Sequence, residues 1–297
     1  MATKGWPAGS KTRWTYGAEF ELSDFPQSRP HRWRTDLDWT MVNSNGIAVD
    51  PSGRVYKFGG EILTFPTTCA SGVSDQLSEF IVKFPEASVN YRSNLHIHVR
   101  VPGLRGDLGK LKKLQMYNSR WLPILLPIIE PIPAPLRSEY LDSKEWLGAR
   151  KRYARRKVSH QRIMPDEIVS RQLAASSCTQ FFDAEAIYQP TGKLLWATKP
   201  RCAVNLRQLL VTDTIEFRHF PGTCDPLKVF TAVCWCRDYL KAAFDDANAL
   251  ELLQTVYSDK PWPKFHPYIH WMEERFLVTN PHYVGVGRAR REIARLI

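Results

Sequence analysis

The sequence has no long apolar segment and no disulfide-rich region. Its longest apolar run, Trp121 to Ile129, is interrupted by proline and is too short to span a bilayer. The first residues lack the apolar core of a signal peptide. The six cysteines form no Cys-x-x-Cys pair, which indicates reduced and mostly buried thiols. These absences lead us to expect a cytoplasmic protein that has no membrane partner.

The common templates of nucleotide-binding and hydrolytic enzymes are missing too. The chain contains no GxGxxG, GxxxxGKS/T, GxSxG or HExxH segment, so the corresponding nucleotide and hydrolase folds are unsupported. It also has no internal repeat and no extended low-complexity region. Any catalytic site must therefore be sought in the pattern of individual strands and helices.

What the sequence does contain is ample apolar material and an excess of basic charge. With 297 residues, of which 43% are hydrophobic and 12% aromatic, it is compatible with one large domain or two ordinary ones. The formal net charge of +11 favours polyanionic partners, such as nucleotides, nucleic acid or acidic surfaces. The charge does not distinguish between these partners, and the oligomeric state is not readable.

Hydrophobic periodicity predicts strands and helices in irregular alternation. We expect strands at 13–22, 94–101, 193–206 and 214–220, a hairpin or strand pair at 54–65 bending at Gly59–Gly60, helices at 73–84, 107–122 and 142–158, a proline-rich connector at 123–135, and a helix starting at Asp225–Pro226. Because this order is not a regular βαβ repeat, it predicts an α+β fold with a mainly antiparallel sheet and helices on one face.

The expected strands place ionisable side chains on one face over an apolar backing. Alternation puts Glu19 and Glu21 on one face of the first strand. In the same way His96 and His98 share a face of the strand at 94–101, and Glu216 and Arg218 share a face of the strand at 214–220. If the strands are neighbours, the converging residues are Glu19, Glu21, Glu61, His96 and Glu216. Each piece alone also has a simpler interpretation as a wet strand face, partly exposed imidazoles or a cross-strand salt bridge.

Divalent cations would remove the repulsion within such a cluster. Carboxylate oxygens with an occasional imidazole suit Mg²⁺ or Mn²⁺. Arg218 follows Glu216 on the same face, where it could contact a phosphate held by these cations. A metal with an arginine is a common arrangement for phosphoryl transfer.

Four motifs resemble the amidoligase family of carboxylate–amine ligases, which have the glutamine synthetase-like fold. They are YGAEFEL at 16–22, GGEILTFP at 59–66, SNLHIHVRV at 93–101 and RCAVNLRQLLVTDTIEFRHFPGT at 201–223, in the order seen in the family. The resemblance covers roughly residues 13–245 and is weak or absent in 120–190. Asn94 stands where the family's histidine strand has glycine.

The resemblance implies a curved, funnel-like sheet with helices on its outer face, and ATP-dependent amide formation through an acyl phosphate held by two Mg²⁺ or Mn²⁺ ions. It implies that Glu19, His96 and Glu216 hold one ion and that Glu21 and Glu61 hold the other. Arg218 would contact the transferred phosphate and His98 the nucleotide or the intermediate. Arg201, Asn205 and Thr223 would make substrate or outer contacts. Residues 10–258 would form the catalytic domain, with an insert at about 105–175, and 259–297 a C-terminal helical extension.

The basic run Arg150 to Lys157 is open to two interpretations. It is either a solvated basic helix or a grip for ATP phosphate, an acidic substrate or nucleic acid, with Arg152 and Arg156 as the residues to test. Two other functions also stay open: a phosphotransferase on the same scaffold, similar to the guanidino kinases, and a non-catalytic, basic nucleic-acid-binding protein. The expected substrates of the ligase are small-molecule or peptide carboxylates and amines.

Overall fold

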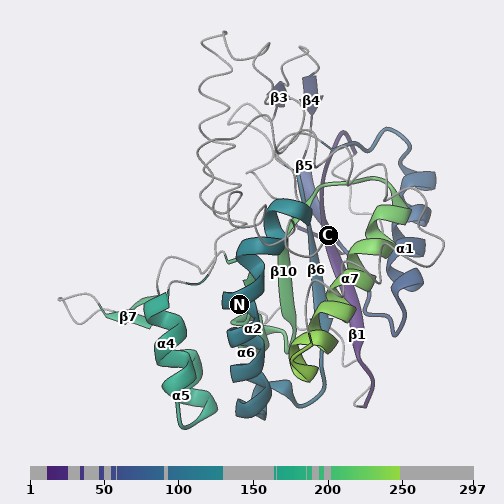
Figure 1. Cartoon of the computed structure of the whole chain (residues 1–297). Coiled ribbons are helices and arrows are strands. Elements are labelled where there is room, and N and C mark those ends of the chain that lie inside the picture. The colour runs from purple at the N-terminus through teal and green to yellow at the C-terminus, as the bar shows by residue number, and fades with distance from the viewer. Residues whose placement is uncertain are drawn as a thin grey trace. The chain divides into compact units, whose positions relative to one another are not determined.

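The computed structural model of the chain (Figure 1) describes residues 12–25, 34–36, 47–49, 55–57, 59–89, 93–129, 164, 166–184, 186–188, 194–196 and 202–247. The chain divides into two compact units. The first comprises residues 1–106, 133–162 and 198–237, and the second comprises residues 107–132, 163–197 and 238–297.

The first unit is built on a six-stranded antiparallel sheet. Its strands, in spatial order, are β2 (Arg34–Asp36), β5 (Gly59–Leu63), β1 (Thr15–Ser23), β6 (Asn94–Arg100), β10 (Ile215–Pro221) and β9 (Val204–Asn205). Figure 1 shows β1, β6 and β10 side by side. The sheet thus joins segments from opposite ends of the described chain, and it is antiparallel as predicted.

The central strands are buried on both faces. The apolar face carries Ala18, Phe20, Leu95, Ile97 and Phe217, each 2% exposed or less. Helix α1 (Ala70–Lys83) contacts β1, and Trp235 of α7 (Pro226–Asp245) packs edge-on against Phe217 and Phe220. The opposite face carries the charged side chains and is largely shielded from solvent, so each buried charge needs a compensating charge or hydrogen bond.

An irregularity in β10 sets the direction of its side chains. Glu216 and Phe217 pair with His98 and Ile97, but the register then shifts so that Phe220 pairs with Leu95. Two residues of β10 therefore lie opposite one residue of β6, which is a β-bulge. The bulge returns Phe220 to the apolar face, where it packs on Trp235.

Short elements complete the first unit. Strands β3 (Ile47–Val49) and β4 (Val55–Lys57) form a separate antiparallel pair, and η2 (Leu104–Gly106) and α6 (Gln208–Val211) are single turns of helix. Asp225 begins α7 as predicted, because its carboxylate accepts the Leu227 backbone N–H at 2.9 Å.

The second unit contains α2 (Leu108–Ile129), α4 (Asp166–Ala174), α5 (Cys178–Asp183), the hairpin of β7 (Ala186–Tyr188) and β8 (Leu194–Trp196), and the end of α7. Helices α2 and α4 contact each other. The Tyr239 hydroxyl of α7 donates to Asn118 of α2 at 2.7 Å, and its ring packs on Tyr117.

Three predicted elements differ from the structure. The 54–65 hairpin is wrong, because β4 pairs with β3 while Gly59 and Gly60 lie within β5 and pair with β1. The connector expected from residue 123 is wrong at its start, because α2 continues to Ile129. The strand at 193–206 is two short strands, β8 and β9, with Pro200 between them.

The remaining expectations for these regions stay predictions. The helix at 142–158 and the extension at 259–297 lie outside the described residues, and the boundaries of the 10–258 domain and its insert are not tested by the sheet. Among the residues that the structure describes, no helix combines the length and apolar character needed to cross a membrane.

Candidate metal centre

Three adjacent strands bring carboxylates and imidazoles together on the polar face of the sheet. Glu19 of β1 lies directly across from His96 of β6, and His98 of β6 lies directly across from Glu216 of β10. Both histidines are 2% exposed and Glu216 is 1% exposed. The Glu19 side chain is 19% exposed, so it is the most accessible member of the group.

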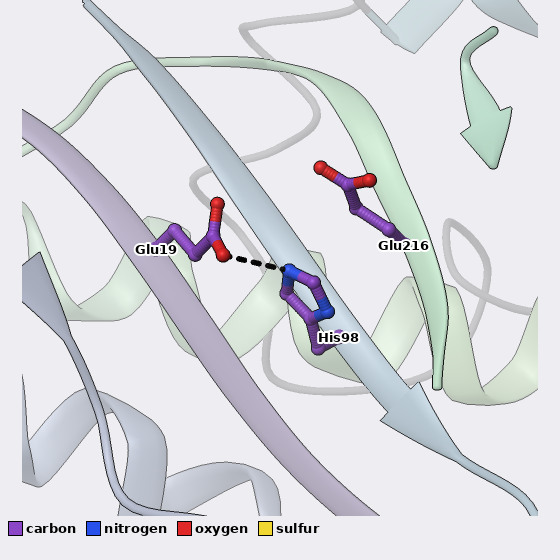
Figure 2. A group of neighbouring side chains, drawn as sticks. All are labelled: Glu19, His98 and Glu216. Carbon is purple, nitrogen blue, oxygen red and sulfur yellow. Dashed lines mark ion pairs between the residues drawn. The ribbon is translucent and has the colours of Figure 1, made fainter. Parts of the chain in front are cut away.

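The side chains are close enough to share one cation. One ligand atom each from Glu19, His98 and Glu216 lie within 4.8 Å of one another (Figure 2). His98 Nε2 is 3.3 Å from Glu19 Oε1. His96 Nδ1 lies on the other side of Glu19, 3.1 Å from its Oε2 and 3.6 Å from Glu216 Oε1.

Opposite charges hold the carboxylates in their ionised form. Burial by itself opposes ionisation of Glu19, but His98 and His96 outweigh it and keep the pKa of Glu19 well below its usual value. Burial likewise opposes ionisation of Glu216, yet Arg218 and the two histidines lower its pKa. For His98, burial favours the neutral ring, but the charge of Glu19 outweighs it and raises the pKa. Ionised carboxylates and an imidazole that favours its protonated form therefore share one cluster.

Glu216 is fixed by two donors. The Arg218 guanidinium bonds its Oε1, and the Asn205 amide donates to its Oε2 at 2.6 Å. Asn205 is itself oriented, because its Oδ1 accepts the Arg207 backbone N–H at 3.2 Å. Both contacts restrict the rotamer of the carboxylate, which leaves the ligand geometry preorganised.

A second group of acids adjoins the first. Glu21 is 2% exposed, and its Oε2 accepts both the backbone and the side-chain N–H of Asn94, at 2.8 and 2.7 Å. Its Oε1 is 3.9 Å from His96 Nε2, so that the His96 ring lies between Glu21 and Glu19. Glu61 of β5 lies directly across from Glu21 in the sheet.

The donor set fits a hard or borderline divalent cation. Two carboxylates and an imidazole converge at distances that one ion can bridge, and Mg²⁺ and Mn²⁺ prefer such oxygen-rich sites. The positively charged side chain of Arg218, which is 17% exposed, forms an ion pair with Glu216 beside this group. The residues thus suit a metal with an anionic ligand beside it.

The structure brings together most of the predicted residues. One cluster contains Glu19, His96, His98, Glu216 and Arg218. Glu21 and Glu61 form the adjoining pair across β1 and β5. The predicted partition into two ion sites stays a prediction; the three residues whose ligand atoms lie within 4.8 Å of one another include His98, which was expected to contact the nucleotide or the intermediate.

The remaining predicted contacts are less central. Asn205 contacts Glu216, and Thr223 accepts the Asp225 N–H at the start of α7, so their roles in substrate binding stay predictions. Arg152, Arg156 and Arg201 lie outside the described residues.

Two residues of the site were missed from the sequence. Asn94 was noted only as a departure from the family's glycine, although it holds Glu21. Thr214 contacts His98 and was signalled by the same alternation that placed Glu216 and Arg218 on one face. Comparison with protein-family models and with curated proteins gives no match, so the chemistry of the site is argued from its geometry.

Proposed function

We propose that the chain is an ATP-dependent carboxylate–amine ligase of the glutamine synthetase-like type, with Glu19, His98 and Glu216 as ligands of a divalent cation. The observation that carries the proposal is the burial of these groups together on three adjacent strands, with Arg218 on Glu216. Such a concentration of acid is costly unless a cation compensates it. Three of the four motifs that resemble the amidoligase family contain the strands that carry these ligands, and the fourth, GGEILTFP, contains β5 with Glu61.

The residues of the site divide the work of the reaction. A bound Mg²⁺ or Mn²⁺ neutralises phosphate charge and orients the nucleotide. Glu19, Glu216 and an imidazole hold the ion, and Asn205 keeps Glu216 in its ligating orientation. Arg218 is placed to stabilise negative charge on the transferred phosphoryl group. The substrate carboxylate would attack the γ-phosphorus of ATP and displace ADP, giving an acyl phosphate; an amine would then displace phosphate from it, form the amide and lose a proton.

The test is ADP release by the purified full chain with Mg²⁺ or Mn²⁺, ATP and a panel of amino acids, polyamines, peptides and nucleic acids. We expect Glu19→Gln, Glu216→Gln and Arg218→Ala each to reduce turnover by about 100-fold or more, the usual effect of removing a group that stabilises developing charge. Glu86→Gln is the matched control, because it changes an exposed carboxylate of the same unit. Normal turnover in Glu216→Gln would overturn the proposed site.

Product analysis distinguishes the second candidate. The same pairing of a cation with Arg218 would serve a phosphotransferase, which yields ADP and a phosphorylated product. A ligase yields ADP, free phosphate and an amide. If the intact protein neither binds nor turns over ATP with either metal, both enzymes are excluded; unchanged RNA or DNA binding in Glu19→Gln then favours the nucleic-acid-binding alternative.

A further inference from the structure

A chain of hydroxyl groups lies behind His98, on the side of the ring away from Glu19. His98 Nδ1 is 2.9 Å from Thr214 Oγ1, and this oxygen is 2.6 Å from Thr212 Oγ1. Thr212 Oγ1 is in turn 3.1 Å from the carbonyl oxygen of Gln208 in α6. Thr214 is 4% exposed, so its contact with the imidazole is shielded from water.

The end of this chain gives it a direction. A carbonyl oxygen can only accept, so Thr212 donates its single hydroxyl proton to Gln208. Thr212 then accepts the hydroxyl proton of Thr214, and Thr214 is left to accept from His98 Nδ1–H. In the neutral ring Nε2 then carries the lone pair and faces Glu19, whose Oε1 is 3.3 Å away; in the protonated ring the same nitrogen carries the proton.

The backbone is shaped to bring the two hydroxyls together. Asp213, between the two threonines, has φ 60, in the left-handed region that few residues other than glycine adopt. Arg100, two residues after His98 on β6, donates from Nε to Asp213 Oδ2 at 2.8 Å. The strand that carries the imidazole therefore also holds the turn that supplies its partner.

We propose that Thr214, supported by Thr212, is a positioning residue that fixes the tautomer of His98 and makes Nε2 the metal-ligating nitrogen. The proposal rests on the metal centre proposed above and goes beyond it by assigning the ligating atom and its support. Metal-bound imidazoles commonly donate their second N–H to such a partner, which orients the ring and raises its basicity.

The test measures Mn²⁺ affinity by calorimetry on full-length protein stripped with EDTA. We expect Thr214→Val, which keeps the shape and removes the hydroxyl, to weaken Mn²⁺ binding by about 10- to 100-fold. Thr214→Ser restores the hydroxyl and should bind within about threefold of the wild type. Thr231→Val is the matched control, because Thr231 is similarly buried but donates to Leu227 within α7.

The outcomes are distinct. Wild-type Mn²⁺ affinity in Thr214→Val would overturn the positioning role of Thr214 but leave the metal centre in place. Absence of Mn²⁺ binding in the wild type would overturn both proposals. If Thr214→Val weakens Mn²⁺ binding but the wild type shows no ATP turnover, the positioning role of Thr214 is supported and only the proposed ligase activity is contradicted. If Thr214→Val fails to fold in EDTA, Thr212→Val tests the hydrogen bond that supports Thr214. Reduced Mn²⁺ affinity of this variant supports the positioning role, and unchanged affinity of the folded variant overturns it.

Discussion

At the scale of single residues, the site depends on partners contributed by other strands. Glu21 is held by Asn94, Glu216 by Asn205 and His98 by Thr214, and each contact crosses from one strand or turn to another. Such contacts restrict the orientation of each buried side chain. Removing an uncharged partner such as Asn94 should therefore leave a buried carboxylate with an unsatisfied oxygen and lower the free energy of unfolding.

Asn94 provides the first prediction. Asn94→Ala removes the side-chain donor to Glu21, and we expect it to lower the free energy of unfolding in EDTA by about 1.5–3 kcal/mol, the usual contribution of a hydrogen bond to a charged group. Urea unfolding of Asn94→Ala, Glu21→Ala and the double variant measures the coupling. Strictly additive effects of the two substitutions would show that the contact contributes nothing.

Cysteine reactivity provides the second prediction. Burial raises the pKa of the Cys224 thiol to about 11, and it raises that of Cys236 well above its usual value, whereas Cys69 is exposed. At pH 8 only about one in a thousand Cys224 thiols is ionised, so timed alkylation read by mass spectrometry should modify Cys69 first. Cys69→Ser should remove the fast phase. Equal rates at Cys69 and Cys236 in the native protein would contradict the expectation.

At the scale of elements, the sequence predicts which side chains share a strand face, but it does not predict which strands pair with one another. Period-two patterning identified the polar faces of β1, β6 and β10, because each strand has an apolar opposite face to bury. The bulge in β10 depends on pairing with β6, and the partnership of β5 with β1 depends on contacts distant in sequence. Asn94 and Thr214 were missed for the same reason, because their roles follow from the register.

The close approach after β10 gives the third prediction. A Cβ on Gly222 would lie 2.5 Å from Ser93 Cβ and 2.8 Å from the Ser93 carbonyl carbon, so Gly222→Ala must displace backbone. We expect a loss of about 1–3 kcal/mol in the free energy of unfolding, measured by urea denaturation. Gly106→Ala is the control, since nothing lies within 4 Å of its added Cβ. Equal stability of the two variants would show that the chain relaxes at Ser93 without cost.

At the scale of the whole molecule, the charge of the cluster links stability to pH. In the folded protein the pKa of Glu19 is below its ordinary 4.5, because the histidines outweigh its burial, and that of His98 is above its ordinary 6.5, because Glu19 outweighs its burial. The Glu19 contribution to stability is present above about pH 4.5 and is lost as the pH falls through its lowered pKa. The His98 contribution is present below about pH 6.5 and is lost as the pH rises through its raised pKa.

The fourth prediction follows for thermal unfolding in EDTA. We expect the melting temperature to fall on the alkaline side as His98 loses its proton, and we expect this fall to be smaller in His98→Asn. Saturating Mn²⁺ should also reduce the alkaline fall in the wild type, because the ion replaces the proton between His98 and Glu19. An alkaline fall of equal size in His98→Asn would assign the effect to other groups.

The order of strands in the sheet has a consequence for how the protein is made. The proposed ligands Glu19, His98 and Glu216 come from β1, β6 and β10, so their cluster requires pairing between the beginning of the described chain and residues beyond 214. Long-range pairing of this kind is slow to form, because loop closure precedes any gain in contacts. During synthesis, we therefore expect these side chains to stay unassembled until β10 has left the ribosome. Under the proposed function, capture of a divalent ion would therefore follow completion of the sheet.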